Sequence, residues 1–517
     1  MKKIISMLAI ATLVGAFWSC SEDDPAVDNG VTISGVPATA EIENLGTVGP
    51  VTATIEAADG LASLVVTKGT ASFASETYAG ETSATYEFSY TATAEDEDKL
   101  VTFTFTATDK DGDVETVTHV LSVGAAPEVP TTIIVDANIT ENTTWETGKT
   151  YVLAGRVTVL DGKTLTIQPG VVVKGQAGTG ANATALLVAR GAKLMAEGTA
   201  ALPIIFTSVA DELTPADVAA GNFASPNLDP DVNGLWGGVI VLGKAKISTQ
   251  TKDIDGNFTG VDIEEVQIEG IPTSDANGLY GGSDDEDNSG VIKYISIRHG
   301  GANIGAGNEI NGLTLGGVGR GTEIENVEVV ANQDDGIEWF GGTVDVKNIV
   351  VWNVGDDGLD TDQAWSGTAE NFVIVTVSGH SFELDGPEGT YGTTAGSTTT
   401  FHTFKNGTVV ASSADIASEN LINTDNNSGV KFDGLFITGL ENSTANNIIS
   451  RLSVSSGIQE FLDVIINVPA GKTINDFMKD GGAPPTGVSA AATATKKADV
   501  SVLGWTWASK AGELTGL

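Results

Sequence analysis

Acidic side chains recur at a fixed spacing in the second half of this 517-residue chain. Segments that begin at Asn326, Asn348 and Asn371 align without a gap, at offsets of 22 and 23 residues. One column of the repeat reads Thr314, Glu338, Asp360, Glu383 and Lys431, and a neighbouring column reads Phe340, Asp362, Asp385 and Asp433. Stacked carboxylates raise one another's pKa, share a proton or hold a cation. The spacing therefore predicts a functional face, and the alternative is a solvated surface on a strongly acidic chain.

Calcium is the cation that such a face would hold, because Ca²⁺ takes carboxylate oxygens as ligands. We expect the ligands to be Asp360, Asp362, Glu383 and Asp385. The same face predicts a glycan-binding surface made of Glu338, Asp360, Asp362, Glu383 and Asp385, with Trp352 and Trp365 as sugar-stacking rings. For both tryptophans the alternative is packing under a loop.

Catalysis is the second interpretation of these residues. The candidates are Asp357, Asp360, His380, Glu383 and Lys431. Carboxylates on adjacent rungs lie about 5 Å apart, which approximates the pair of a retaining glycosidase. Asp356, Asp357 and His380 also resemble, in chain order, elements of polygalacturonase-type β-helix hydrolases, although the final Arg-Ile-Lys element of those enzymes has no counterpart. A lyase would instead use Lys431 as the basic side chain beside a calcium cluster.

The repeat period indicates how these side chains are positioned. Runs of three to six apolar residues are broken by Gly or Asp-Gly, and no amphipathic helices separate them. Strands this short must stack, and 22 or 23 residues suit one turn of a parallel β-helix, in which each rung covers the next. We therefore predict a β-helix over residues 131–475, with rungs about 4.8 Å apart.

Two apolar columns would fill the interior of this β-helix. One contains Ile295, Val327, Ile349 and Phe372, and the other contains Leu313, Ile337, Leu359, Phe382 and Val430. Because successive residues of a strand point to opposite faces, the acidic columns would point outward. Residues 476–517 would form a cap that closes the last rung, with a strand around Trp505 and Trp507.

The region before the repeats has a different sequence pattern. Residues 31–126 form short alternating strands, and Val101, Phe103 and Phe105 share one side of a strand whose other side carries threonines. This two-residue period predicts a β-sandwich with one wet face. The end of the region, from Thr106 to Val123, resembles an immunoglobulin-like domain of bacterial surface proteins.

The N-terminus has the features of an export signal. Over residues 1–19, two lysines precede an apolar run that is too short for a typical membrane span. Cys20, the single cysteine, follows directly, so the pattern resembles a bacterial lipoprotein signal with a lipid attached to Cys20. The acidic tether at residues 20–30 resembles the surface-export signal of Bacteroidota-type lipoproteins. These resemblances imply a lipid anchor in the outer membrane and a chain that faces the outside of the cell.

The charge excludes one class of partner. The chain has 68 Asp and Glu against 26 Lys and Arg, which gives a formal net charge of −42. Such a surface repels phosphate backbones, so we expect no nucleic-acid partner. The lone cysteine excludes an internal disulfide.

Longer motifs carry a resemblance to a known family. The segments LTIQPGVVVKG, LWGGVIVLGKA, NEINGLTLGGVGRGTEIENVEVV, DDGIEWFGGTVDVKN and DDGLDTDQAWSG look like those of secreted Bacteroidota right-handed β-helix lipoproteins, which are often mislabelled multidrug transporters. The resemblance implies an all-β chain: an N-terminal immunoglobulin-like β-sandwich followed by a right-handed parallel β-helix. We expect a surface-exposed outer-membrane lipoprotein that binds a glycan or surface partner through its acidic face. The alternative is a polysaccharide lyase or glycoside hydrolase that uses the same face.

Overall fold

The computed structural model divides the chain into two compact units, Met1–Val129 and Pro130–Leu517. It describes residues 30–124, 131–304, 309–394, 397–411, 421–425, 427–441, 459–478 and 481–517. The predicted signal peptide, Cys20 and nearly all of the acidic tether lie outside these residues. Among the described helices, none is long and apolar enough to cross a membrane.

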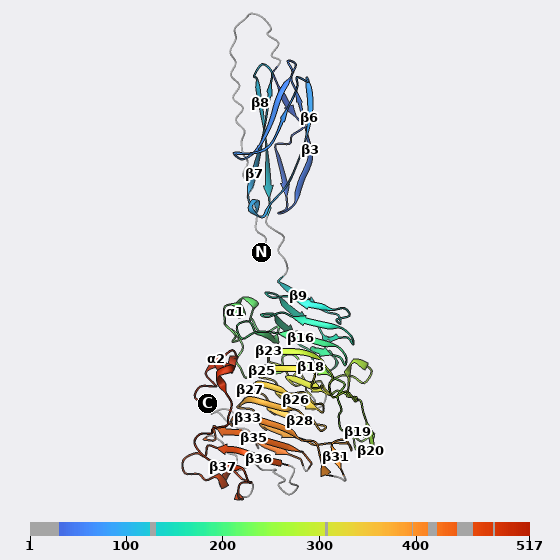
Figure 1. Ribbon diagram of the computed structural model, residues 1–517, viewed down its shortest axis with the longest axis vertical. Helices are drawn as coiled ribbons and strands as arrows, with labels where there is room; N and C mark the ends of the chain where they lie inside the picture. The colour runs from blue at the N-terminus through green and yellow to red at the C-terminus, as the bar shows by residue number, and fades with distance from the viewer. Residues whose placement is uncertain are drawn as a thin grey trace, which may run out of the picture. The chain divides into compact units, whose positions relative to one another are not determined.

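The first unit is a sandwich of two sheets (Figure 1). One sheet contains β1 (Thr32–Ser34), β3 (Thr47–Glu56) and β6 (Ser83–Thr91), and the other contains β2 (Thr39–Ile42), β8 (Val114–Val123), β7 (Leu100–Asp109), β4 (Leu61–Lys68) and β5 (Ala71–Thr77). Phe103 and Phe105 of β7 pack against Phe88 of β6, and all three rings are fully buried. The predicted alternation is therefore confirmed, and it explains the sandwich, because one side of each strand must be covered.

The second unit is a parallel β-helix built mainly from two sheets (Figure 1). The long sheet contains β9 (Thr132–Val135), β10 (Thr143–Trp145), β11 (Thr150–Leu153), β13 (Thr164–Ile167), β14 (Val172–Gly175), β16 (Lys193–Glu197), β17 (Ile204–Ser208), β23 (Gly290–Arg298), β25 (Glu323–Val330), β27 (Val346–Trp352), β29 (Thr368–Val375), β33 (His402–Val410), β35 (Val430–Thr438), β36 (Gln459–Ile466) and β37 (Val488–Ala490). The short sheet contains β12 (Arg156–Val159), β15 (Ala185–Val188), β18 (Val239–Leu242), β24 (Leu313–Gly316), β26 (Ile337–Phe340), β28 (Leu359–Asp362), β30 (Phe382–Leu384) and β34 (Ile422–Thr424). The predicted all-β fold class, a sandwich followed by a parallel β-helix, is confirmed.

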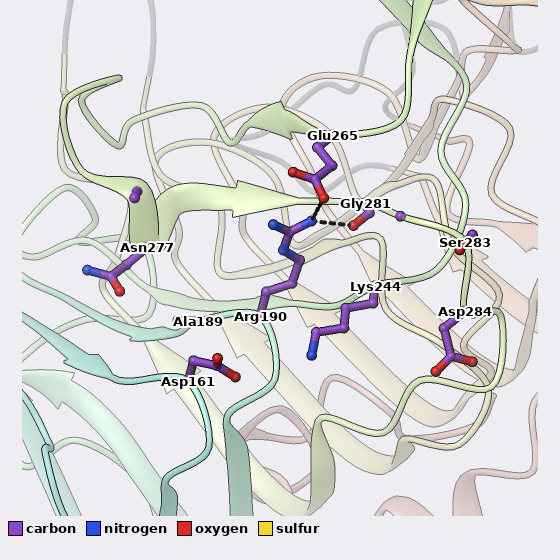
Figure 2. Close-up of a pocket in the computed structure, with 11 residues that line it drawn as sticks. Asp161, Ala189, Arg190, Lys244, Glu265, Asn277, Gly281, Ser283 and Asp284 are labelled. Atoms are coloured by element: carbon purple, nitrogen blue, oxygen red, sulfur yellow. Dashed lines mark hydrogen bonds and ion pairs between the residues drawn. The ribbon is translucent and has the colours of Figure 1, made fainter.

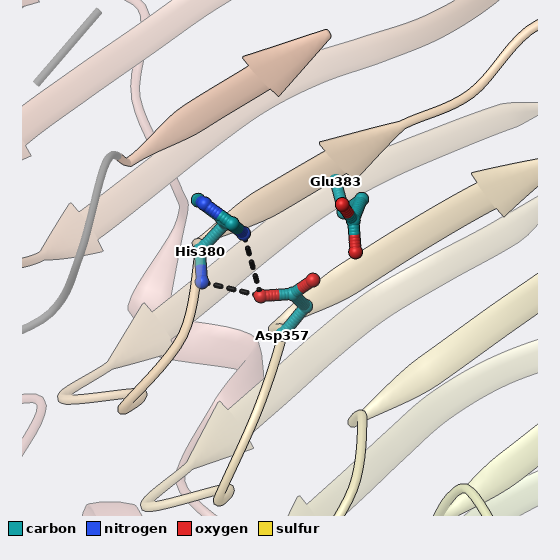
Figure 3. A group of neighbouring side chains, drawn as sticks. All are labelled: Asp357, His380 and Glu383. Carbon is teal, nitrogen blue, oxygen red and sulfur yellow. Dashed lines mark hydrogen bonds and ion pairs between the residues drawn. The ribbon is translucent and has the colours of Figure 1, made fainter. Parts of the chain in front are cut away.

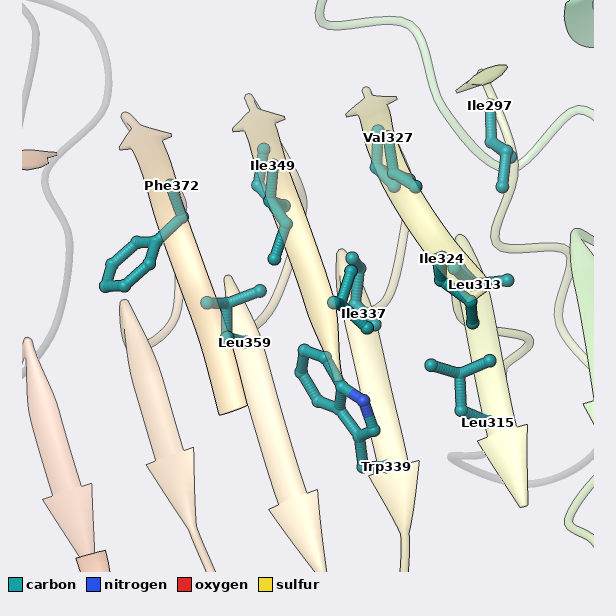
Figure 4. Close-up of a cluster of buried hydrophobic side chains, with 14 of the residues drawn as sticks. Ile297, Leu313, Leu315, Ile324, Val327, Ile337, Trp339, Ile349, Leu359 and Phe372 are labelled. Carbon is teal, nitrogen blue, oxygen red and sulfur yellow. The ribbon is translucent and has the colours of Figure 1, made fainter. Parts of the chain in front are cut away.

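The interior columns stack in register as the sequence predicts. Leu313, Ile337, Leu359 and Phe382 occupy one position on four successive strands of the short sheet, and none of them is exposed. Figure 4 shows Leu313, Ile337 and Leu359 of this column beside Val327, Ile349 and Phe372 of the long sheet. Each rung therefore buries its apolar side chains against the rungs before and after it.

One predicted member of these columns is misplaced. Val430 belongs to β35 of the long sheet, where it lies opposite His402. The position after Phe382 is taken by Ile422 of β34. The pattern around Val430 alternates like that of the short sheet, so the sequence alone does not tell the two sheets apart.

Asparagines hold a corner of the repeat. Asn326, Asn348 and Asn371 have φ of 59°, 58° and 59°, a left-handed conformation that Asn tolerates better than most residues. The Nδ2 atom of Asn348 donates to Oδ1 of Asn326 at 3.1 Å, and Nδ2 of Asn371 donates to Oδ1 of Asn348 at 2.8 Å. These bonds link successive rungs and satisfy amides that are largely buried.

An insertion between β18 and β23 covers part of the short sheet's outer face. It contains β19 (Thr249–Lys252), β20 (Phe258–Ile263), β21 (Val266–Gln267), the 3₁₀ turn η3 (Ala276–Gly278) and β22 (Leu279–Tyr280). Leu187 and Ile240, which point outward from the sheet, form a second apolar cluster with Ile268 and Tyr280 of this insertion. The smaller elements elsewhere in the unit are η2 (Gly180–Asn182), α1 (Pro215–Ala219), β31 (Thr393–Thr394) and β32 (Ser397–Thr398).

The C-terminal residues have two roles. Phe477, at the end of η5 (Ile474–Phe477), and Val488 join the core beside the last rungs. Residues 498–517 lie instead against the outer face of the long sheet, where they form η7 (Val500–Leu503) and α2 (Trp507–Ala511). The predicted strand around Trp505 and Trp507 is therefore wrong, because Trp507 begins a helix that covers the long sheet.

Candidate functional site

The acidic column forms on the short sheet, but it is shorter than predicted. Glu338, Asp360 and Glu383 lie opposite one another on β26, β28 and β30. The next position is Asn423, not Lys431. Three successive carboxylates therefore occupy neighbouring rungs on one face.

Lys431 and Asp433 lie on the other sheet. In β35 of the long sheet, Lys431 is opposite Thr403 and Asp433 is opposite Lys405. Asp433 is paired with Lys496 at 2.9 Å. The predicted role of Lys431 as a lyase base beside the acidic column is therefore wrong, and Asp433 is not part of the second acidic column.

The acidic face is not the open surface that the sequence suggests. Only 8% of Glu338 is exposed, and Asp360, Asp362 and Glu383 are half-buried. Burial, reinforced by the neighbouring carboxylates, holds the pKa values of Glu338 and Asp360 well above those of ordinary carboxyl groups. Burial, with Glu388 and Asp385 nearby, raises the pKa of Asp362 to about 8.

A second acidic row lies at the corner before these strands. Asp335 and Asp357 occupy equivalent positions on successive rungs, and Oδ1 of Asp335 accepts a hydrogen bond from the backbone of Asp357 at 2.9 Å. Oxygens of Asp334, Asp335 and Asp356 lie within 4.8 Å of one another. Burial, with Asp356 as the strongest neighbouring charge, raises the pKa of Asp334 to about 7. The repeated Asp-Asp-Gly motif signals this row, although such motifs are equally typical of plain turns.

The two rows meet in a group that could hold a cation. Oxygens of Asp335, Glu338 and Asp360 all lie within 4.8 Å of one another. Oxygens that share one Ca²⁺ at 2.3–2.6 Å cannot be more than about 5.2 Å apart, so this group fits the ion. It overlaps the predicted ligand set only at Asp360; neither Asp362 nor Asp385 belongs to any such group among the described residues.

Asn311 supplies a separate indication at the same place. Its side chain is 6% exposed, and its Nδ2 atom donates to a carboxylate oxygen of Glu338. Its Oδ1 atom is buried and has no hydrogen-bond partner among the described residues. An amide oxygen is a normal Ca²⁺ ligand, and a buried acceptor without a partner is costly. The three carboxylates of Asp335, Glu338 and Asp360 therefore fit a calcium ion, and Oδ1 of Asn311 is a further candidate ligand beside Glu338.

Asp357, His380 and Glu383 form another compact group (Figure 3). The Nδ1 atom of His380 lies 3.1 Å from Oδ1 of Asp357, which also accepts the backbone N–H of His380. Burial opposes ionisation of Asp357, yet hydrogen bonds from His380 and Glu383 hold its pKa below the ordinary value. Burial and the hydrogen bond to Asp357 raise the pKa of Glu383 to about 9. At neutral pH this group therefore combines a carboxylate with a protonated carboxyl group.

A groove of about 710 Å³ runs beside the acidic face. Residues of β19 and Glu388 line one part of it, and Phe340 and Asp362 of the short sheet line another. At its mouth, Nζ of Lys252 is 3.9 Å from Oε1 of Glu388. The groove gives a ligand access to Asp362, a predicted binding residue. Asp385 is exposed and follows β30.

The two predicted sugar-stacking tryptophans are not available for that role. Trp365 is 1% exposed and stacks on Trp339 at 4.5 Å inside the β-helix. Trp352 is 4% exposed and packs against Trp507 of the C-terminal segment. Both predictions are wrong, because residue type alone does not show what will cover a tryptophan.

The family comparison agrees with the architecture. Residues 137–508 match the family described as the pectate-lyase like beta helix domain. A solved structure, the family 28 exopolygalacturonase of Yersinia enterocolitica, is 11% identical, and the alignment covers 88% of this chain and 97% of that enzyme with a TM-score of 0.21. No curated protein sequence matches the chain. Since the family match spans more than half of its length, the chain belongs to the pectate-lyase-like β-helix domain family.

Proposed function

We propose that this protein binds a glycan through the acidic face of its β-helix, with Ca²⁺ held by Asp335, Glu338, Asp360 and Asn311. The observation that carries the proposal is the group of three carboxylates within 4.8 Å of one another, beside the unpartnered Oδ1 atom of Asn311. A groove large enough for part of a saccharide lies beside this face.

Calcium would have two effects at this site. It would compensate the charges of carboxylates that burial otherwise keeps protonated, and it would offer coordination positions to ligand hydroxyl or carboxylate oxygens. The chain's own residues supply the rest of the surface. Asp362 and Glu388 can accept hydrogen bonds from sugar hydroxyls in the groove, and Lys252 can donate one.

The proposal also includes a location. The sequence over residues 1–20 supports cleavage before Cys20 and lipid attachment to it, which would tether the protein to the outer membrane on the extracellular side. Mass spectrometry of the mature N-terminus tests the modification. A Cys20→Ser variant that still fractionates with the membrane, and that remains accessible to protease on whole cells, would contradict this part of the proposal.

A glycan array read with Ca²⁺ and with EDTA tests the binding. We expect EDTA, Glu338→Gln and Asp360→Asn each to lower binding at least tenfold, because each removes the ion or one of its ligands. Glu460→Gln removes one negative charge from an exposed position in β36 of the long sheet and serves as the matched control. Equal binding by all four proteins, with and without EDTA, would contradict the proposal.

Glycoside hydrolysis is a second candidate, favoured by Asp357, His380 and Glu383. Their pKa values are pushed apart, as in acid–base pairs of glycosidases. Glu383 would protonate the departing oxygen while a water molecule attacks the anomeric carbon, and the proton that the water releases would return to Glu383. Asp357 is 1% exposed, so it would act by holding Glu383 protonated through their hydrogen bond. A reducing-end assay with Asp357→Asn and Glu383→Gln tests this reaction, and we expect both variants to lose any cleavage activity.

A further inference from the structure

A second pocket lies on the insertion side of the short sheet, apart from the acidic column. It has a volume of about 440 Å³, and its lining includes Asp161, Arg190, Lys244, Glu265, Asn277 and Asp284. None of the carboxylates discussed above lines it. Most of its lining side chains are polar and carry charges of both signs, which suits a ligand that makes hydrogen bonds, while alanines and glycines supply the rest of the lining.

One cation of this pocket is already neutralised. Arg190 lies 2.7 Å from Oε1 of Glu265, and the same guanidinium nitrogen donates to the carbonyl of Gly281 at 2.7 Å (Figure 2). These contacts hold the Arg190 side chain in the lining of the pocket. Because Glu265 compensates its charge, Arg190 and Glu265 together add no net charge to the pocket.

The second cation, Lys244, has no such partner. Across the described residues, its ammonium group makes no ion pair within 4.0 Å and no hydrogen bond, and Figure 2 shows it extending into the pocket. A Cβ atom built on Gly191 would lie 2.1 Å from Oδ1 of Asp161 and 2.8 Å from Nζ of Lys244. Gly191 also has a φ of 81°, so a side chain at this position is excluded twice and cannot displace either charged group.

The unsatisfied groups are both donors and acceptors. Lys244 offers N–H donors, Asp161 offers carboxylate oxygens, and the Ser283 hydroxyl offers both. The Nδ2 atom of Asn277 donates to Oδ1 of Asp275 at 2.8 Å, so the side-chain oxygen of Asn277 is the atom that could accept from a ligand. A sugar hydroxyl, which donates one hydrogen bond and accepts others, satisfies such a mixed set better than a purely accepting anion does.

The charge balance points the same way. With Arg190 and Glu265 paired, one cation faces two carboxylates, those of Asp161 and Asp284, which leaves the pocket slightly negative. The chain as a whole carries a formal charge of −42, so its field repels polyanions at low salt. The pocket therefore disfavours a negatively charged ligand.

The position of the pocket relates it to the groove beside the acidic face. Gly282 and Ser283 also line a neighbouring cavity of about 350 Å³ that contains Tyr391. Thr249 and Ile263 line both that cavity and the groove. The pocket and the cavity share lining residues, as do the cavity and the groove, so an extended saccharide chain could contact all three in turn.

From this geometry we infer that the pocket around Lys244 and Asp161 is a saccharide subsite for an uncharged, hydroxyl-rich sugar unit, and that it acts without calcium. It deepens the proposed glycan binding by naming the class of sugar at one end of the path. It does not depend on the calcium group, since none of that group's residues lines the pocket.

The test is calorimetric titration of the full chain in EDTA with neutral hexasaccharides of glucose, mannose, galactose and xylose, and with hexagalacturonate as the charged probe. We expect at least one neutral hexasaccharide to bind more tightly than hexagalacturonate. Lys244→Gln and Asp161→Asn should each weaken that binding about tenfold, which is the usual effect of removing a hydrogen bond to a charged group. Ser283→Trp, which fills the pocket from an exposed loop, should abolish it.

Matched variants separate this inference from the proposed function. Lys193→Gln removes an exposed charge from β16 and should change the affinity less than twofold. Glu338→Gln and Asp360→Asn should leave the affinity for the neutral hexasaccharide in EDTA unchanged. This result is expected whether or not the same variants lower glycan binding in calcium, which is the test of the proposed function. The inference is overturned if no neutral hexasaccharide binds, if hexagalacturonate binds more tightly, or if Lys244→Gln and Ser283→Trp bind like the wild type.

Discussion

The acidic face should make the β-helical unit less stable as the pH rises from 7 to 9 in EDTA. Burial and neighbouring charges raise the pKa of Asp362 to about 8 and that of Glu383 to about 9. Both values exceed those of unfolded carboxyl groups, which lie near 4. In this range the folded chain therefore holds protons that the unfolded chain has already released. Stability is lost as these protons leave.

The size of the effect follows from the same two groups. Above pH 7, Asp362 contributes about one pKa unit and Glu383 about two, at about 1.36 kcal/mol for each unit. We halve the contribution of Glu383, because its side chain is partly exposed and solvent screens it. These two groups alone should thus lower the free energy of unfolding by about 3 kcal/mol. For a unit of this length, that corresponds to a decrease in Tm of about 4 °C.

Scanning calorimetry at a fixed scan rate measures this decrease, and the sandwich provides an internal reference transition. We expect Asp362→Asn and Glu383→Gln to flatten the pH dependence, and Glu460→Gln to leave it as in the wild type. Calcium should raise the Tm more at pH 8 than at pH 5, because its ligands must be deprotonated. A Tm that stays constant or rises from pH 7 to 9 in EDTA would refute the assignment of protonated carboxyl groups.

Three further substitutions test the packing. Trp365→Ala should lower the free energy of unfolding by about 3–5 kcal/mol in denaturant titrations and leave glycan affinity unchanged in the folded protein, since the ring lies inside the β-helix. Asp96→Asn should lower the free energy of unfolding of the sandwich alone by about 1.5–3 kcal/mol, because the Asp96 carboxylate lies 2.7 Å from Nζ of Lys68. A sandwich transition with an unchanged Tm would contradict this. Glu328→Gln should leave the buried guanidinium of Arg298 without a counter-charge, cost about 3–5 kcal/mol, and speed limited proteolysis within residues 498–517, which dock on Glu328 through the backbone of Ala508.

The interior of the β-helix could be predicted because its columns obey a local rule. Leu313, Ile337, Leu359 and Phe382 each need an apolar neighbour one rung away, and a constant period supplies it. The prediction fails where the period is interrupted. Between Phe382 and Val430 the chain makes long excursions, and the strand that continues the short sheet, β34, is only three residues long. Nothing in its local alternation distinguishes it from a turn.

The exposure of the site could not be predicted, because residues distant in the sequence determine it. The repeat shows that Glu338 points out of the β-helix, but not that the insertion between β18 and β23 lies over the same face. The cation group likewise required Asn311, which stands one rung before Asp335 in the corner row and carries an amide where the later rungs carry carboxylates. Spacing predicts which side chains share a face, whereas the surroundings of that face come from loops whose paths the spacing does not encode.

The composition of the outer face of the short sheet supports the proposal that its carboxylates serve a functional site. Earlier rungs of the column that contains Glu338, Asp360 and Glu383 carry Leu187 and Ile240, which are buried under the insertion. The fold therefore accepts apolar residues in this column, and they stabilise it by removing their surface from water. Carboxylates in the later rungs repel one another and lose solvation, so they destabilise the same face. Folding does not require that change from apolar to acidic, but a site for a cation and a hydroxyl-rich ligand does.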